Sequence, residues 1–225
     1  QICAFAVITG KLDTNPAADL AAALPSARAK HMPAITAPEK VGPLLRAIDG
    51  YEGEAAVRAA LQLAPLVFVR PGELRGARWD EIDLDGGRWE IPGGRMKMGD
   101  PLLVPLSRQA VAILKGMGPL TGSGPLVFTC TRTSDRPISN NTLNAALRRL
   151  GFTKEQMTAH GFRAMARTLI EEELDVRPEL IEMQLGHKVK DPNGYAYNRT
   201  KHLQARVEMM QRWADYLDEL RSSRA

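Results

Sequence analysis

The sequence predicts a mainly α-helical protein with one small three-stranded antiparallel sheet, an α+β fold. Apolar residues recur every three or four positions along most of the chain, which is typical of amphipathic helices. Strand-like alternation is strong only between residues 81 and 106. The 225 residues are 44% apolar, 25% charged and only 5% aromatic, so an ordinary globular core built mostly from aliphatic side chains is expected.

The first 33 residues differ from the rest of the chain. A helix is predicted to end near Gly10, and a stretch rich in Ala and Pro then leads to Pro33. We predict a domain boundary there, with a larger domain in residues 34–225. Because the chain begins at Gln1 within an apolar helical stretch, we expect it to be part of a longer protein.

Three helices are predicted before the sheet. The first follows Pro38 and is supported by apolar residues at helical spacing up to Ile48. The second covers about residues 54–63 and is expected to stop at Pro65. The third begins at Pro71, because proline suits the first turn of a helix.

The predicted sheet is a meander. Its strands lie at about residues 81–84, 88–92 and 102–105, separated by glycine-rich turns. Lys97 lies in the second of these turns.

Helical spacing returns after the sheet. The predicted helices cover about residues 107–117, 139–150, 161–174, 178–185 and 201–220. The last one carries an apolar stripe formed by Leu203, Val207, Met210, Trp213, Leu217 and Leu220. We expect this stripe to pack on its own domain, because an exposed stripe with a tryptophan is unfavourable in water.

Charge and motifs narrow the function. The net charge is +4, and two basic segments, residues 139–170 and 186–212, flank the acidic segment 171–182. No apolar run approaches the roughly 18 residues of a membrane span, and two distant cysteines predict neither a disulfide framework nor a CxxC metal site. We therefore expect a cytoplasmic protein without a membrane partner. Phosphate-loop, dinucleotide-binding, GxSxG and HExxH motifs are missing from the sequence.

The remaining chemical candidates are scattered along the chain. They are Arg70 with Glu73, Lys97, His160 with Arg163, His187 and Tyr197. Taken singly, each has an ordinary structural explanation, such as a surface ion pair, a solvated turn or a helix cap. Taken together, they fit phosphodiester chemistry. Two guanidinium groups and histidine N–H groups can bind the charged phosphate, a phenol can attack it, and a lysine can protonate the leaving oxygen.

The sequence resembles the catalytic domain of tyrosine recombinases, in the phage and genomic-island integrase branch, over about residues 34–220. Five segments carry the resemblance: Val69–Arg75, Met96–Gly99, Ala159–Arg163, Gln184–His187 and Gly194–Arg199. It implies a catalytic set of Arg70, Lys97, His160, Arg163, His187 and Tyr197, with Glu73 in support. It also implies a covalent 3′-phosphotyrosine intermediate, a free 5′-hydroxyl, and no metal or other cofactor.

The resemblance also implies partners. Double-stranded attachment sites would be bound by four subunits, from a protein that we expect to be monomeric without DNA. The basic side chains expected to contact DNA are Arg148, Arg149, Lys188, Lys190, Arg199 and Lys201. Residues 1–33 would be the end of a core-binding domain and its linker.

Two points stay open at this stage. A DNA-binding module without catalysis, or a topoisomerase that relaxes DNA without exchanging strands, would share parts of the pattern. The nucleophile is a choice between Tyr195 and Tyr197, which periodicity does not separate because residues two apart in an extended loop point the same way. We predict Tyr197, which adjoins Asn198 and Arg199 and matches the nucleophile segment of similar integrases.

Overall fold

The computed structural model describes residues 2–18, 20, 32–97, 99–130, 133–187 and 202–223. The chain divides into two compact units, Gln1–His31 and Met32–Ala225. The first contains helix α1 (Ile2–Ile8), on which Ile2 and Phe5 are exposed. The division lies close to the boundary predicted after residue 33, and the assignment of the first segment to a core-binding domain stays a prediction.

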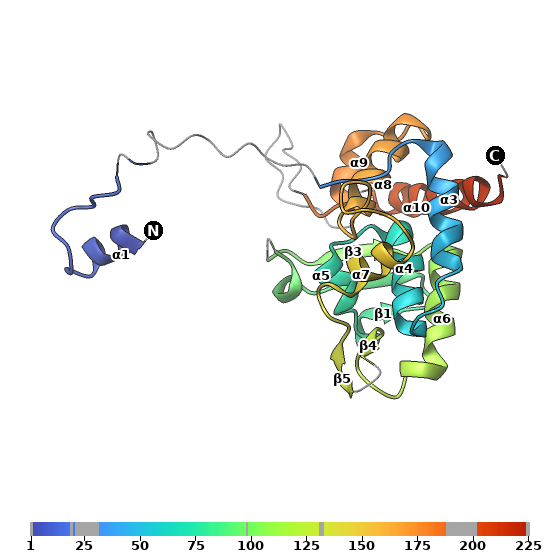
Figure 1. Ribbon diagram of the computed structural model, residues 1–225, viewed down its shortest axis with the longest axis horizontal. Helices are drawn as coiled ribbons and strands as arrows, with labels where there is room; N and C mark the ends of the chain where they lie inside the picture. The colour runs from blue at the N-terminus through green and yellow to red at the C-terminus, as the bar shows by residue number, and fades with distance from the viewer. Residues whose placement is uncertain are drawn as a thin grey trace. The chain divides into compact units, whose positions relative to one another are not determined.

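The second unit is mainly helical, as predicted. Its helices are α3 (Pro38–Asp49), α4 (Ala55–Val67), α5 (Pro71–Arg75), α6 (Arg108–Thr121), α7 (Thr142–Arg149), α8 (Gly161–Glu172), α9 (Pro178–Gln184) and α10 (Leu203–Ser222). Helix α4 is the centre of the packing, with α3, α6, α7 and α8 against it (Figure 1). Ten of its 13 residues are buried, because its sequence is apolar on almost every side.

The predicted meander is present. Strands β1 (Ile82–Asp83), β2 (Arg88–Ile91) and β3 (Leu102–Pro105) pair antiparallel in that order. Trp89 and Ile91 are buried while the residues alternating with them are exposed, which explains the period of two in the sequence. The first strand is shorter than predicted because Trp79–Glu81 forms a 3₁₀ turn, η1, and Leu84 already belongs to the turn that leads to β2.

A second sheet was not predicted. Strands β4 (Thr129–Cys130) and β5 (Thr133–Pro137) form a two-stranded antiparallel hairpin. The β5 sequence, TSDRP, is polar throughout and ends in proline, so it lacks the alternation of a half-buried strand.

The prediction that the second helix stops at Pro65 was wrong. Helix α4 continues through Pro65 to Val67 and ends at Phe68, a buried residue in the left-handed conformation with φ 37°. A proline removes only one helical N–H, and the surrounding core holds this last turn in place. The carbonyl of Pro65 accepts a hydrogen bond of 2.8 Å from the Trp213 indole.

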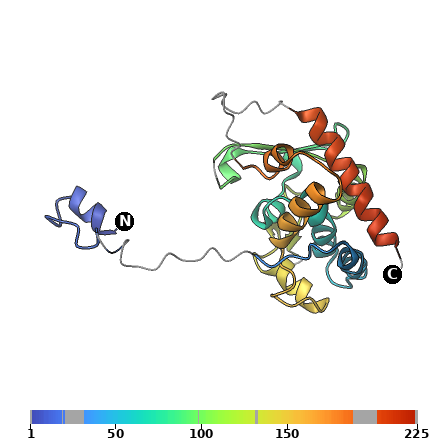
Figure 2. The same cartoon turned by 90° about the horizontal axis from the view of Figure 1, so that it is seen from above.

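Helix α10 packs on its own unit, as predicted. It runs across α3, α4, β3 and α9 (Figure 2), and Trp213 and Leu217 are fully buried. Gly42 on α3 allows close approach, because a Cβ there would lie 2.3 Å from the carbonyl oxygen of Leu220. Of the predicted stripe, Val207 is 41% exposed and lies outside the core. Within the described residues, the structure has no helix long and apolar enough to cross a membrane.

Candidate active site

Arg70 is held at the start of helix α5. It caps the helix, its backbone N–H donates to Glu73 Oε2 at 2.8 Å, and its Nη1 donates to Glu73 Oε1 at 2.8 Å. The Glu73 side chain is 3% exposed and that of Arg70 is 19% exposed. Glu73 therefore fixes the guanidinium of Arg70 while leaving part of it exposed, and its supporting role in catalysis stays a prediction.

Arg163 lies in the interior of the site, on the first turn of α8. It is 5% exposed, its Nη1 donates to the carbonyl of Phe68 at 2.9 Å, and its Nη2 donates to the carbonyl of Leu185 at 2.8 Å. Phe68 ends α4 just before Arg70, and Leu185 ends α9 just before His187. Burial, together with the nearby cation of Arg70, lowers the pKa of Arg163 to about 10.

His187 sits between a carboxylate and this buried guanidinium. Its Nδ1 lies 2.5 Å from Glu182 Oε2, and its Nε2 lies 3.3 Å from Arg163 Nη2. Because a guanidinium only donates hydrogen bonds, we assign the hydrogen to Nδ1, which donates to Glu182, and the lone pair to Nε2.

Glu182 is braced on its other side by Arg167, whose Nε donates to Oε1 at 3.0 Å. Burial alone would raise the pKa of Glu182, but the hydrogen bonds from His187 and Arg167 outweigh it, so the pKa is lowered. Sequence reasoning missed both residues. The sequence signal that could have pointed to Glu182 is Gly186, a residue suited to ending a helix. Its φ of +67° turns the chain back after α9, so that the N–H of His187 donates to the carbonyl of Glu182 at 3.0 Å.

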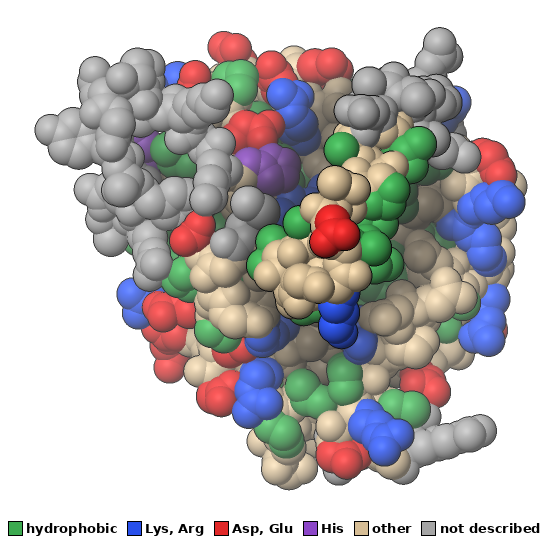
Figure 3. Space-filling view, turned by 90° about the vertical axis from the view of Figure 1, so that its left-hand side faces the viewer, with side chains coloured by type: hydrophobic (Ala, Val, Ile, Leu, Met, Phe, Trp, Pro, Cys, Tyr) green, Lys and Arg blue, Asp and Glu red, His purple; other side chains and the backbone are tan. Residues whose placement is uncertain are grey.

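His160 is the N-cap residue of α8 and is half-buried. Burial lowers its pKa, and the cations of Arg163 and Arg70 lower it further, so the ring is neutral at pH 7. Figure 3 shows histidine side chains at the surface of the face that it displays, with acidic and basic side chains near them. The structure thus brings Arg70, His160, Arg163 and His187 together, as the sequence predicted.

The other two predicted catalytic residues are Lys97 and Tyr197. Lys97 is exposed in the turn between β2 and β3, and no hydrogen bond or ion pair joins it to another described residue. Tyr197 lies outside the described residues, as does its competitor Tyr195. Their roles stay predictions.

Of the six residues predicted to contact DNA, two are described in the structure and four are not. Arg148 is half-buried and donates from Nε to the carbonyl of Asn144 at 3.4 Å and from Nη2 to that of Met157, while Arg149 is exposed with Nη1 3.5 Å from the Tyr51 hydroxyl. Those that lie outside the described residues are Lys188, Lys190, Arg199 and Lys201. DNA contact stays a prediction for all six.

Comparison with known proteins adds the family. The family model described as the phage integrase family matches residues 35–202. The integrase of Enterobacteria phage P4 is 39% identical over 231 positions, covering 96% of this chain and 52% of that protein. The putative protein IntB of Escherichia coli K12 is 40% identical, covering 96% of this chain and 58% of that protein. The chain spans about half the length of these curated relatives.

Solved structures with the same fold are more distant in sequence. The integrase of mycobacterium phage Brujita has a TM-score of 0.62 at 18% identity and covers 97% of this chain and 73% of that one. A λ integrase dimer bound to a COC′ core site has a TM-score of 0.59 at 20% identity, covering 86% of this chain and 57% of that one. With the fold of these integrases and a family model matched over most of its length, the chain belongs to the phage integrase family.

Proposed function

We propose that this chain is the catalytic part of a site-specific recombinase, which cleaves and rejoins double-stranded DNA through a covalent 3′-phosphotyrosine intermediate. The observation that carries the proposal is the buried Arg163. Its hydrogen bonds to Phe68 and Leu185 hold together the segments that present Arg70 and His187, and His160 begins the helix on which it lies. Three segments far apart in the sequence thereby form one cluster that contains two guanidinium groups.

The chemistry follows from the charges. The guanidinium groups of Arg70 and Arg163 would bind the non-bridging oxygens of the scissile phosphate and stabilise the charge that builds up there. His160, neutral at pH 7, has a lone pair available to accept the proton of the attacking phenol. In the proposed step the Tyr197 oxygen bonds to phosphorus, the bond to the 5′ oxygen breaks, and Lys97 protonates that oxygen. Attack by a 5′-hydroxyl reverses the sequence and rejoins the strand.

Covalent capture tests the function without knowledge of the target site. The chain is incubated with a pool of nicked duplexes of randomised sequence, and adducts that survive denaturation are sequenced. Wild type is expected to form adducts that Tyr197→Phe cannot form and Tyr195→Phe still forms, because Phe keeps the ring and loses the nucleophile. Adducts that persist in Tyr197→Phe and vanish in Tyr195→Phe would transfer the role to Tyr195.

The same experiment separates the alternatives. DNA binding without any adduct would indicate a binding module. Adducts together with relaxation of supercoiled DNA, and no exchange between two sites, would indicate a topoisomerase.

Metal independence, assembly and location are part of the proposal. Adduct formation is expected to continue in EDTA, because the cations of the proposed site are side chains. A λ integrase tetramer has been solved on a Holliday junction, and we propose four subunits on paired DNA sites for this protein too, with a monomer in the absence of DNA. Action on DNA supports the cytoplasm as its location. Sedimentation with and without the captured site tests the assembly.

A further inference from the structure

The two residues that precede Lys97 in its exposed turn are held by contacts with other segments. We propose that Arg95, with Met96 beside it, is a positioning residue that holds the Lys97 turn against the segments presenting Arg70 and His187. The inference rests on the proposed role of Lys97 as the acid that protonates the leaving 5′ oxygen.

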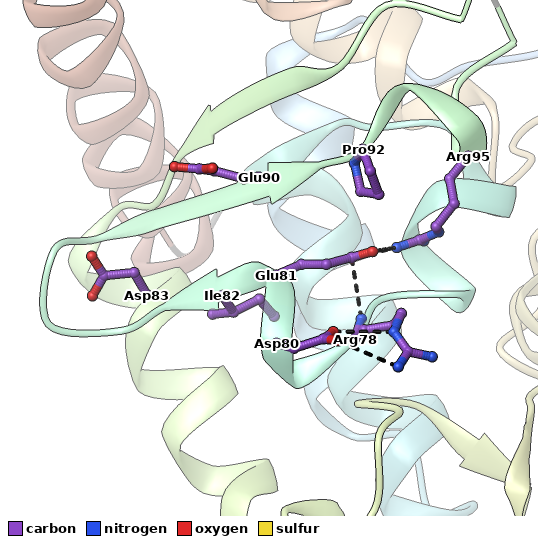
Figure 4. Close-up of a pocket in the computed structure, with 8 residues that line it drawn as sticks. All are labelled: Arg78, Asp80, Glu81, Ile82, Asp83, Glu90, Pro92 and Arg95. Carbon is purple, nitrogen blue, oxygen red and sulfur yellow. Dashed lines mark hydrogen bonds and ion pairs between the residues drawn. The ribbon is translucent and has the colours of Figure 1, made fainter.

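Arg95 connects the hairpin to the Arg70 segment directly. Its Nη2 donates to the backbone carbonyl of Glu73 at 2.7 Å, and the carboxylate of this same Glu73 holds Arg70. Its Nη1 binds both carboxylate oxygens of Glu81. Figure 4 shows Arg95 reaching down from the hairpin to meet Glu81, in a concavity of about 550 Å³ that both residues line.

The far end of this connection is firmly placed. The Glu81 side chain is 7% exposed, and its Oε2 also accepts hydrogen bonds from the Trp89 indole at 3.1 Å and the Arg78 backbone N–H at 3.3 Å. Trp89 is fully buried in β2. A buried carboxylate with three donors has little freedom to move, since a displaced donor would leave it unpaired.

Met96 connects the next position to the His187 segment. Its side chain is buried, and its Cε lies 3.3 Å from the point that a Cβ on Gly186 would occupy. Gly186 is the left-handed residue that turns the chain into His187. The two residues before Lys97 therefore contact two different segments of the site.

The consequence for Lys97 is geometric. Consecutive Cα atoms are about 3.8 Å apart, so the Lys97 backbone stays close to both anchors while its side chain, exposed in the structure, is free to reach a bound DNA strand. Loss of Arg95 should then impair the step that needs the lysine and leave phosphate binding by Arg70 and Arg163 largely intact. A defect in fold alone would impair both.

Leaving-group chemistry separates these possibilities. The captured site is made with an ordinary phosphodiester or with a 5′-bridging phosphorothiolate, whose sulfur leaves without needing a proton. Lys97→Ala, Arg95→Ala and Arg95→Lys are compared, with Arg78→Ala as the matched control. Arg78 lines the same concavity and pairs with the exposed Asp80 through its side chain, and its backbone bond to Glu81 survives the substitution.

Lys97→Ala is expected to cleave the ordinary site about 10²- to 10⁴-fold more slowly than wild type, the range for loss of a general acid. Arg95→Ala should lose at least about tenfold, and both should recover to near wild type on the phosphorothiolate. Arg95→Lys keeps a charge beside Glu81 but has no second arm for the Glu73 carbonyl, so it should fold normally and show the same selective loss. Arg78→Ala should cleave both substrates as wild type does.

Three outcomes would overturn the inference. Equal losses on both substrates for Arg95→Ala and Arg95→Lys would assign Arg95 to the fold or the phosphate site. An unchanged rate in both would show that the turn needs no anchor. Failure of the phosphorothiolate to rescue Lys97→Ala would remove the acid role on which the inference rests, while adduct formation by wild type would still support the proposed recombinase chemistry.

Discussion

Replacing Arg163 by Met should slow cleavage strongly, while the free energy of unfolding should change much less than the burial of this residue suggests. Arg163 is 5% exposed, and methionine replaces the aliphatic part of its side chain without the charge. The substitution removes the hydrogen bonds to the carbonyls of Phe68 and Leu185. It also removes a cation that the fold holds at an energetic disadvantage, close to Arg70.

The two effects are comparable in size. The pKa of Arg163 is lowered from its ordinary value to about 10, and at about 1.36 kcal/mol per pKa unit this lowering corresponds to a destabilisation of the folded state by about 3 kcal/mol. The folded pKa lies below the unfolded value, so this destabilisation is complete at neutral pH and declines only above about pH 10. Each hydrogen bond from a charged donor contributes about 1.5–3 kcal/mol, so losing two removes about 3–6 kcal/mol. The net loss in unfolding free energy is therefore about 0–3 kcal/mol.

Urea unfolding measures the stability, and single-turnover adduct formation measures the chemistry. The cleavage rate should fall at least about 10²- to 10³-fold, as when one donor to a developing oxyanion is removed. Arg58→Met, at an exposed position on α4, is the control and should change stability by less than about 0.5 kcal/mol. A stability loss above about 5 kcal/mol, or unchanged adduct formation, would refute the reasoning.

Four further outcomes are expected. DNA affinity should fall steeply with salt in a filter-binding titration, because the proposed contacts release counterions; a flat response would contradict phosphate contact. Sulfate should raise the melting temperature of wild type more than that of Arg163→Met, since a bound oxyanion offsets the repulsion between Arg163 and Arg70 in addition to the general effect of the salt. The pKa of His160 is lowered in the folded state, so the contribution of this residue to the free energy of unfolding should be complete above pH 6.5 and be lost as the pH falls through the folded pKa. Urea titrations of His160→Gln should lack this pH dependence. Trp213→Ala should lower the unfolding free energy by about 3–5 kcal/mol, because the ring is fully buried and its indole bonds Pro65.

The parts of the site that sequence could predict depend on short-range geometry. Glu73 follows Arg70 by three residues at a helix start, and His160 precedes Arg163 by three on another, so each pair shares a helix face once the helix is recognised. The core helices and the meander follow from apolar periods of about 3.6 and 2 in the same way. These regularities need no knowledge of what packs against them.

The missing parts depend on contacts between distant segments. The carbonyls that Arg163 binds lie 95 and 22 residues away, and no spacing rule marks a backbone carbonyl as a partner. In the sequence, Arg95 is one basic residue in a glycine-rich turn. Its contacts become evident only in the folded structure, where it binds residues of α5 and η1. Pro65 was misjudged for a related reason, since burial by α10 outweighs the local preference to end a helix.

The position of Arg163 explains why this site has to be built by tertiary contacts. An arginine that only bound phosphate could lie at the surface, where its charge would be well solvated. Burying it makes the cation poorly solvated before DNA arrives, and the pKa of Arg163 is lowered for that reason. A phosphate diester would then gain more from Arg163 than from a hydrated arginine, because less water has to be displaced and the guanidinium is already oriented by Phe68 and Leu185. The hydrogen bonds that orient the Arg163 guanidinium also hold the segments that carry Arg70 and His187. One residue, Arg163, therefore determines both how strongly the cluster would attract a phosphate and how its side chains are arranged.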